Sequence, residues 1–464
     1  MVETKNSSET PPAEAIDEIG LSDETIAEII DELHEEQTEE LTAHIHDLSI
    51  ADTSDLLHKV NEEDRNALLQ KYAQDFDPNV FSELDSELQR AALSEMPAEK
   101  VAYIISALES DDALDIIETL DPAFQKEILR KLSRQDRIAI EEGLTFPEES
   151  AGRLMQREYV AIPQFWTVGK TIDYLRAAAE ELPEDFLDLI VIDPAYHVIG
   201  EIPLNRLVRS PRSVKIQDLT LDTLHTVPAD MDQEEVAHIF RRENLASAPV
   251  VDLNGRLLGV ITIDDVLDVI DEEHHEDILK LGGVEGDDLY RAVLSTTRSR
   301  FKWLFVNLLT AILASVVISF FDATLEQIVA LAILMPIVAS MGGNAGTQAL
   351  TVAVRALATK ELSGTNMLRV LWKETLVGTL NGAGFAILMG GIAGFWFGSP
   401  VLGVIIASAM MINLVVAGIF GAGIPVFLHR IGSDPALSST VFLTTVTDIV
   451  GFFGFLGLAS VFLI

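Results

Sequence analysis

The sequence predicts a multidomain protein with an α-helical superhelix at its N-terminus, an α+β tandem domain in the middle and an all-α transmembrane domain of five helices at its C-terminus. Three observations predict this order. A helix-pair pattern recurs within residues 21–150, a strand-and-helix pattern recurs within residues 151–263, and five apolar segments follow within residues 303–464. Each apolar segment reaches the ~20 residues that a helix needs to cross a bilayer.

Charge is distributed unevenly along the 464-residue chain, whose formal net charge is −41. Five basic and six acidic residues follow Trp303, so residues 1–302 carry −40 of that charge. Such a region attracts cations and repels nucleic acid, so no nucleic-acid partner is expected. Solubility or adaptation to a salty habitat is an alternative cause of the acidity that composition leaves open. The chain has no cysteine, which excludes disulfides and thiolate chemistry.

The N-terminal part is expected to be helical after a disordered tail. Residues 1–20 are polar and lack the apolar region of a signal peptide. Within the helical domain, 21–150, the segment 52–72 resembles the segment 112–132 at an offset of about sixty residues. Each segment reads as helix, turn and helix, which favours a superhelix over two unrelated helix pairs.

Residues 151–263 contain short β-branched runs such as LIVID (189–193) and LLGVITI (257–263), with helical patterns between them. The pattern occurs twice and resembles a tandem pair of CBS modules, which dimerise and often bind adenosine nucleotides. Thr262 and Asp265 match the ribose-binding signature of that family. The first copy has Pro203 and Arg206 at the matching positions. The resemblance therefore implies at most one site per pair for ATP or another adenosine nucleotide.

An acidic connecting helix and linker, 264–302, lead to the membrane. Residues 264–281 form an amphipathic helix whose polar face is rich in carboxylates, and Gly282 and Gly283 end it. A further linker helix is expected at about 287–300. The adjacent His274 and His275 point in different directions on a helix, which disfavours a transition-metal site.

Five spans are expected, at about 303–321, 327–358, 372–397, 401–427 and 437–463. Basic residues precede the first span and occupy the loops after the second and fourth spans. This alternation predicts a multi-pass protein of the cell's inner (plasma) membrane, with cytoplasmic N-terminal domains and the C-terminus outside.

The second span contains MGGNAGTQAL (341–350), which we interpret as an interruption that lines a pore through Asn344 and Gln348. Close helix packing through small residues is the alternative. In the fifth span, Thr440, Thr444, Thr447 and Asp448 recur at three- and four-residue steps and are therefore expected to share one face. A carboxylate with hydroxyl neighbours suits hydrated Mg²⁺. The alternative is a protonated Asp448 bonded to a neighbouring helix.

Together these segments resemble the MgtE family of magnesium channels over nearly the whole chain. The most specific matches are Pro336 with GGNAGTQ (342–348), RALA (355–358), DPALSS (434–439) and TTVTDIVG (444–451). The resemblance implies a homodimer in the lipid bilayer with one pore between its protomers. It also implies that Mg²⁺ is both the permeant and the regulatory ion, and that the pore ligands are the carboxylate of Asp448 and the backbone carbonyl of Thr444.

In the family, the pore closes when cytosolic Mg²⁺ binds between the acidic domains. The matching positions here are Asp265, Asp268, Glu273, Glu276, Asp277, Glu234, Asp111 and Asp115. Two departures concern Asn79, where the family has an acidic residue, and Thr440, where the family often has Gly or Asn before Pro.

The sequence thus predicts a magnesium-selective channel or transporter for Mg²⁺ uptake that cytosolic Mg²⁺ closes. A proton- or sodium-coupled divalent cation exchanger is the alternative, disfavoured because the five spans show no inverted repeat. A membrane-anchored nucleotide sensor is disfavoured by Asp448 and the second span. No enzyme motif is present, so the protein is not expected to be an enzyme.

Overall fold

The computed structural model describes residues 20–35, 38–183, 186–221, 223–284, 293–362, 364–436 and 439–463. They form two compact units, residues 1–271 and 272–464, which divide within one long helix. The tail expected to be disordered, residues 1–20, lies outside the described residues except for Gly20.

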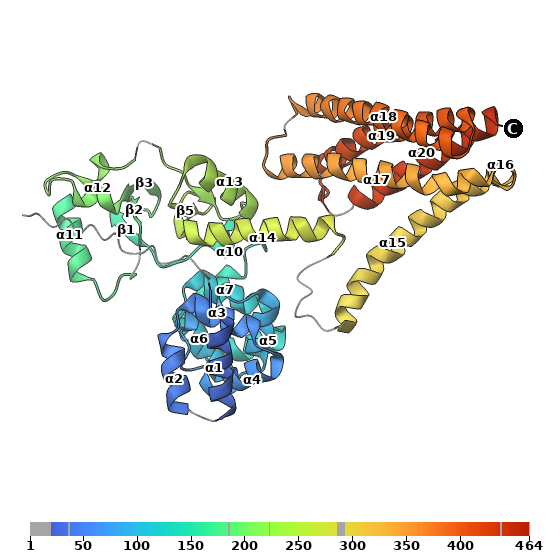
Figure 1. The fold of residues 1–464 in the computed structure, drawn as a ribbon. Coiled ribbons are helices and arrows are strands. Elements are labelled where there is room, and N and C mark those ends of the chain that lie inside the picture. Colours follow the sequence, from blue (N-terminus) through green and yellow to red (C-terminus); the bar gives the residue numbers. More distant parts are fainter. Residues whose placement is uncertain are drawn as a thin grey trace, which may run out of the picture. The chain divides into compact units, whose positions relative to one another are not determined.

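The N-terminal part is a superhelix of short helices, as the sequence predicts (Figure 1). Side chains cap several of them: the oxygens of Ser49, Asn61 and Ser133 each accept a backbone N–H of the following first turn. The segment 52–72 lies in α3–α4 and the segment 112–132 in α7–α8, so each repeat is a helix pair. The elements are α1 (Asp23–His34), α2 (Thr38–Asp47), α3 (Ile50–Lys59), α4 (Glu62–Tyr72), η1 (Pro78–Phe81), α5 (Ser86–Ser94), α6 (Ala98–Ile105), α7 (Ser110–Thr119), α8 (Pro122–Leu129) and α9 (Arg134–Gly143). The short α10 (Ala151–Leu154) follows and packs with the tandem domain.

The tandem α+β domain contains two three-stranded sheets of the same topology. In each sheet the first strand pairs in parallel with the second, and the second pairs antiparallel with the third. Irregularities at Val191 and Val250 fall at matching positions and confirm the internal repeat. The first copy comprises β1 (Val160–Pro163), α11 (Val168–Ala177), β2 (Asp188–Ile192), β3 (Val198–Pro203), α12 (Leu204–Val208) and η2 (Ile216–Asp218); the second comprises β4 (Val227–Pro228), α13 (Gln233–Glu243), β5 (Ser247–Val251), β6 (Leu257–Thr262) and α14 (Ile263–Leu281).

Polar contacts join the superhelix to the tandem domain. The Ser110 hydroxyl, at the start of α7, donates to Glu158 at 2.7 Å and accepts the backbone N–H of Arg157 at 2.8 Å. Arg153 of α10 forms an ion pair with Glu118 of α7. These contacts hold both ends of α7 beside the tandem domain.

The C-terminal unit contains five helices that are long and apolar enough to cross a membrane, as the sequence predicts. They are α15 (Val293–Ser319), α17 (Val329–Ala358), α18 (Met367–Trp396), α19 (Pro400–Arg430) and α20 (Ser439–Phe462), with the short α16 (Asp322–Gln327) between the first two. Helix α19 packs against α17, α18 and α20. Of its most apolar 18-residue stretch, 56% is buried, compared with 6% of the corresponding stretch of α15. The core of this unit is therefore built around α19.

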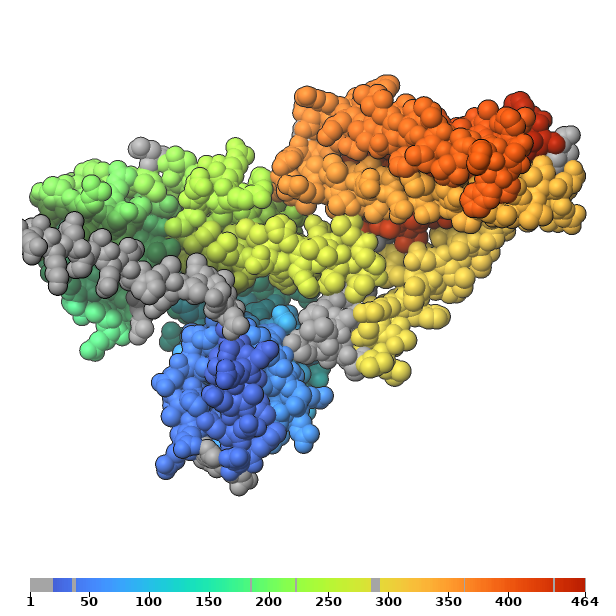
Figure 2. Space-filling model, viewed as in Figure 1, coloured from blue at the N-terminus to red at the C-terminus, as the bar shows by residue number. Residues whose placement is uncertain are grey.

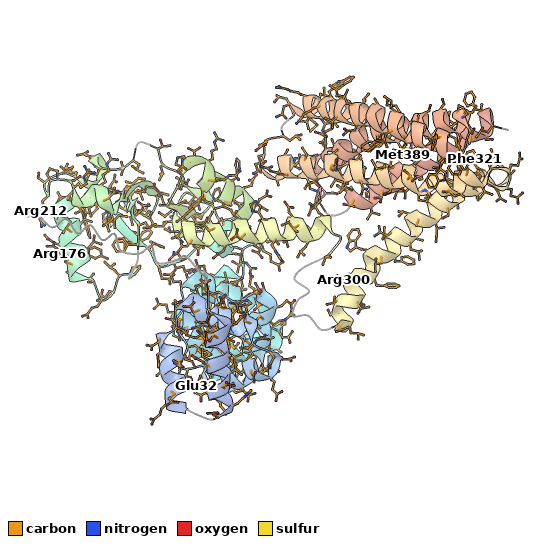
Figure 3. All side chains as sticks on the ribbon, viewed as in Figure 1. Glu32, Arg176, Arg212, Arg300, Phe321 and Met389 are labelled. Atoms are coloured by element: carbon orange, nitrogen blue, oxygen red, sulfur yellow. The ribbon has the colours of Figure 1, made fainter. Side chains whose placement is uncertain are left out.

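Helix α15 packs along α20 but diverges from the other spans in its N-terminal half, where Arg300 lies (Figure 2 and Figure 3). Phe321, labelled in Figure 3, lies just after α15 and meets Phe453 of α20 edge to face, with 5.8 Å between ring centroids. Most of the apolar surface of α15 is exposed in a single protomer.

Two expectations about these helices are wrong. The segment 341–350 does not interrupt the second span, because α17 is a continuous helix through Pro336 and these residues. Gly342 and Gly346 instead let side chains of neighbouring helices approach closely, so these glycines serve packing. Residues 293–300 belong to α15 itself, without a separate linker helix, and residues 287–292 lie outside the described part of the chain. The long basic side chains at the start of α15 can extend from the end of the span toward the membrane interface.

A valine at Gly418 of α19 should destabilise the membrane unit, because an added Cβ would lie 2.6 Å from the carbonyl oxygen of Glu374 in α18. Overpacking of this kind costs about 1–3 kcal/mol. Gly423→Val in the same helix is the matched control, since its Cβ would meet no atom closer than 3.9 Å. Thermal unfolding of the detergent-solubilised protein checks the difference; equal melting temperatures would contradict it.

Candidate ion sites

Helix α20 presents a polar stripe beside a buried one. Thr440, Thr444 and Asp448 are half-exposed at four-residue intervals. The buried stripe begins one residue earlier in each turn and consists of Leu443, Thr447, Gly451, Phe455 and Ala459. Three of the four residues expected on one face therefore share it, at the edge of the contact that α20 makes with the rest of the bundle. Thr447 is the exception, because it lies in the buried stripe.

Asp448 has neither a hydrogen bond nor an ion pair to any residue that the structure describes. A carboxylate at bilayer depth costs about 2.5–3.5 kcal/mol on insertion scales, so such residues usually face the interior of a helix bundle or a water-filled cavity. The nearby threonines are bonded back to their own helix: the Thr444 hydroxyl donates to the Thr440 carbonyl at 3.0 Å, and the Thr447 hydroxyl donates to the Thr444 carbonyl at 3.1 Å. The hydroxyl oxygens keep acceptor capacity beside Asp448. The Thr444 carbonyl keeps it when the Thr447 hydroxyl donates instead to the Leu443 carbonyl, which also lies at 3.1 Å.

Helix α17 carries a second polar stripe on the surface of the protomer. Asn344 and Gln348, which the sequence assigns to a pore, are both exposed. Ser340, Thr347 and Thr351 are also exposed and extend the same stripe along the helix. Amides and hydroxyls facing lipid would lose their hydrogen bonds to water, so this stripe indicates contact with another polar surface or with a water-filled space.

A cluster of carboxylates lies where α7 meets the start of α14. Asp111 is buried, and its Oδ2 has no hydrogen-bond partner within the described residues. Burial, and then the charge of Asp265, raise the pKa of Asp111 well above its ordinary value. The same two causes raise the pKa of Asp112 to about 7. Burial raises the pKa of Asp265 to about 6, although the hydrogen bond from the Thr262 hydroxyl acts in the opposite direction. These groups repel one another unless protons or cations lie between them.

Asp265 is also the residue that the ribose signature selects. Its Oδ2 accepts the Thr262 hydroxyl at 2.5 Å and the Thr262 backbone N–H at 3.3 Å, so the two signature residues form one local unit. A cavity of about 1030 Å³ elsewhere in the tandem domain is lined by Asp188, Glu201 and Asn205 among others, and by neither signature residue. Asp265 instead approaches Asp111 and Asp112.

The remaining sensor candidates are distributed along α14 and nearby helices. Partial burial, and then the charge of Glu83, raise the pKa of Asp268. Near the other end of α14, burial and then the charge of Asp434 raise the pKa of Asp277. Glu276 forms an ion pair with Lys280, which also lies 3.2 Å from Asp434. Glu273 is half-buried on α14, Glu234 is exposed in the first turn of α13, and Asp115 is exposed on α7.

Sequence reasoning missed Asp112, Glu83 and Asp434, which approach the predicted carboxylates from other elements. Asp112 adjoins Asp111 and is the first residue of the repeated segment 112–132. Glu83 lies four residues beyond Asn79 and brings a carboxylate to the part of the superhelix where the family's acidic residue is absent. Asp434 belonged to the matched DPALSS segment, but its proximity to α14 is a tertiary property that no local pattern reports.

The C-terminal end of α14 contacts the start of α20. Leu281 packs against Leu350 of α17 and Leu443 of α20. The Thr440 hydroxyl donates to the Leu281 carbonyl at 3.4 Å. Gly283, at φ 71°, ends α14 in the left-handed conformation that glycine favours. One helix therefore carries Asp265 near its beginning and touches the polar stripe of α20 at its end.

Within the described residues, no group of three or more His, Asp or Glu side chains is gathered closely enough to coordinate a bare metal ion. Mg²⁺ does not require such a group, because it dehydrates reluctantly and usually keeps several waters. The carboxylate pairs and clusters described above suit an ion held through its water shell.

Five membrane-crossing helices with an unpartnered intramembrane carboxylate, joined to an acidic tandem domain, define a multi-pass membrane transporter of cations. Three family models match the sequence: the divalent cation transporter domain MgtE over residues 335–458, the MgtE intracellular N domain over 48–149, and the CBS domain over 216–272. The chain belongs to the MgtE family, whose members are transporters and not enzymes.

Two magnesium transporters named MgtE are similar over most of their length. The protein of Thermus thermophilus is 34% identical over 355 residues, which are 76% of this chain and 78% of the relative. That of Bacillus subtilis is 31% identical over 361 residues, 77% of this chain and 80% of the relative. A crystal structure of the cytosolic domain of the Mg²⁺ channel MgtE in complex with ATP is 29% identical, covers 53% of this chain and 99% of its own, and has a TM-score of 0.49.

The carboxylate cluster predicts an unusual pH dependence for the metal-free protein. The pKa of Asp112 is raised from 3.8 to about 7, and that of Asp265 from 3.8 to about 6. Between pH 3.8 and these raised values, the folded state therefore binds more protons than the unfolded state. Stability should therefore fall as pH rises from about 4 to about 7, by roughly 1–2 kcal/mol per group after allowance for screening. Mg²⁺ should flatten this dependence.

Thermal unfolding of the full-length protein in chelator, from pH 5 to pH 8.5, measures the effect. Asp112→Asn should weaken the pH dependence, whereas Glu40→Gln, on the exposed surface of α2, should leave it unchanged. A metal-free protein whose stability rises over this range would show that the cluster is not the dominant titrating group.

Proposed function

We propose that the protein is a Mg²⁺-selective homodimeric channel for Mg²⁺ uptake, closed when cytosolic Mg²⁺ binds its acidic domains. The proposal rests chiefly on Asp448, which has no partner among the described residues and shares an exposed face with Thr440 and Thr444. Membership of the MgtE family and the magnesium-transporting relatives support Mg²⁺ as the permeant ion.

A second copy of the chain accounts for both polar stripes. If two protomers meet along α17 and α20, then Asn344, Gln348 and Asp448 from each line one water-filled path. Two Asp448 carboxylates would then attract a divalent ion strongly and a monovalent ion less, because Coulomb attraction scales with ionic charge. The Thr444 carbonyl, one turn earlier, would accept hydrogen bonds from the water shell.

Closure follows from the carboxylate clusters. Without a cation, Asp111, Asp112 and Asp265 repel one another in a half-buried place, so the contact between α7 and α14 is weakened. Bound Mg²⁺ offsets that repulsion and shifts the population toward the compact arrangement. A second bridge between Asp277 and Asp434 would fix the end of α14 against the residues before α20. Glu273, Glu276, Asp268, Glu234 and Asp115 are proposed to contribute to the same sites.

Orientation follows from the basic residues at the helix ends. Arg298, Arg300 and Lys302 lie at the start of α15, and Lys360 and Arg369 lie at the turn between α17 and α18. By the positive-inside rule, the acidic N-terminal unit would lie in the cytoplasm and the end of α20 outside the plasma membrane.

An adenosine nucleotide at Thr262 and Asp265 is a second proposed ligand. The hydroxyl and carboxylate are adjacent and their pairing resembles ribose recognition. Because the same Asp265 belongs to the carboxylate cluster, nucleotide and regulatory Mg²⁺ would share one carboxylate. Their binding would therefore be coupled, by an equal factor in each direction.

Mg²⁺ current is expected in patches from cells that express the protein. Discrete openings should disappear when cytosolic Mg²⁺ is stepped from zero to ~10 mM, above the range of typical intracellular sensors. Asp448→Ala should abolish the current, Asp448→Asn should reduce it at least tenfold by removing the charge at unchanged shape, and Asp322→Asn, outside the spans, should leave it intact. Uptake that needs a proton or Na⁺ gradient, without unitary openings, would establish the exchanger in place of the channel.

Nucleotide binding is checked by calorimetry on the full-length protein. Asp265→Asn should weaken ATP binding about tenfold through loss of the ribose acceptor, and it should also weaken regulatory Mg²⁺ binding. Asp277→Asn, at the far end of α14, is the control that should alter regulatory Mg²⁺ binding alone. Unchanged ATP affinity in Asp265→Asn would remove the nucleotide from this position.

A further inference from the structure

Helix α19 carries one buried amide in the middle of the membrane unit, at Asn413, whose side chain is 1% exposed. Its Nδ2 donates to the Val338 carbonyl of α17 at 2.8 Å. Its Oδ1 is buried and has no hydrogen-bond partner within the described residues. A buried unpaired oxygen destabilises a fold, so this amide calls for an explanation beyond packing.

The surroundings of Asn413 are two glycines from two other helices. At Gly451 of α20, an added Cβ would lie 2.8 Å from the Asn413 Nδ2. At Gly342 of α17, an added Cβ would overlap the same amide. Both helices therefore close directly onto the Asn413 side chain, which leaves no room for a larger neighbour on either side.

These two helices are the ones that carry the polar stripes. Gly342 lies two residues before Asn344, and Gly451 lies three residues, or nearly one turn, after Asp448. Asn413 itself is fully buried and belongs to neither stripe. Leucine has a similar volume and would fill the same space without leaving an oxygen unpaired, so packing alone does not account for an amide here.

We propose that Asn413 is a positioning residue for ion permeation: it fixes the spacing of α17 and α20 at the level of Asp448. Its donated hydrogen bond sets α17, and its contact with Gly451 sets α20, so the shape of the ion path depends on a side chain that does not line it. This inference rests on the proposed role of the two stripes as the pore.

Asn413→Leu separates positioning from stability. Replacing the half-satisfied amide by an apolar group of similar size should leave the melting temperature unchanged or raise it. The Mg²⁺ concentration for half-maximal current should nevertheless rise about tenfold. Leu414→Ala is the matched control: Leu414 is equally buried and belongs to the apolar core of the same unit, but it has no amide, and neither Gly342 nor Gly451 closes onto it. This control should lower the melting temperature while leaving half-saturation unchanged.

A double variant tests the same contact in both directions. Gly451→Ala should weaken Mg²⁺ permeation by pushing α20 from the amide, and Asn413→Ala should weaken it by removing the spacer. In combination, the new methyl group at position 451 occupies space that the shortened side chain vacates, so half-saturation should return toward the wild-type value.

Unchanged half-saturation in Asn413→Leu would overturn the inference. So would simple additivity in the double variant, or effects at Asn413 that follow the melting temperature as they do in Leu414→Ala. A wild-type protein without Mg²⁺ current is a different result, because it removes the proposed function itself; a wild-type current that Asp448→Ala abolishes keeps that function whatever the Asn413 variants show.

Discussion

Uncompensated negative charge is the constraint on which both units of this protein depend. In the membrane unit it is the carboxylate of Asp448, which lies in an apolar helix without a partner among the described residues. In the N-terminal unit it is the group formed by Asp111, Asp112 and Asp265, whose pKa values rise because burial and mutual repulsion disfavour their ionised forms. Under the proposed function, one kind of ligand, a hydrated divalent cation, would offset the charge in both places, so permeation and regulation would respond to the same ion.

One helix, α14, belongs to both units of the chain. Helix α14 begins beside the carboxylate cluster and ends against the start of α20, where Leu281 packs on Leu443. The ion pair of Lys280 with Asp434 adds a basic residue to an otherwise acidic surface and gives the end of α14 a contact that does not depend on metal.

The sequence was sufficient for the features that periodicity and charge encode. The helix-pair repeat, the two matching sheets, the five spans and the shared face of Thr440, Thr444 and Asp448 all follow from spacing, and the structure contains each of them. The sequence was misleading at 341–350, where the glycines suggest an interrupted helix although α17 is continuous. Only the tertiary packing shows that Gly342 accommodates the Asn413 side chain. The sequence was silent on Asn413, Glu83 and Asp434, since a single polar residue acquires meaning only from the neighbours that the fold brings to it.

The burial of Asp111 has a consequence for the environment in which the protein works. At an ionic strength of 0.15 M, exposed charges more than about 8 Å apart scarcely interact, but buried charges are screened much less. A sensor made only of surface carboxylates would lose its repulsion, and with it its response, as ordinary salt accumulated. Because one oxygen of Asp111 is withdrawn from solvent, the repulsion at this contact is screened little by the background electrolyte. If the contact serves as the proposed sensor, monovalent salt would therefore be a poor substitute for a divalent ion.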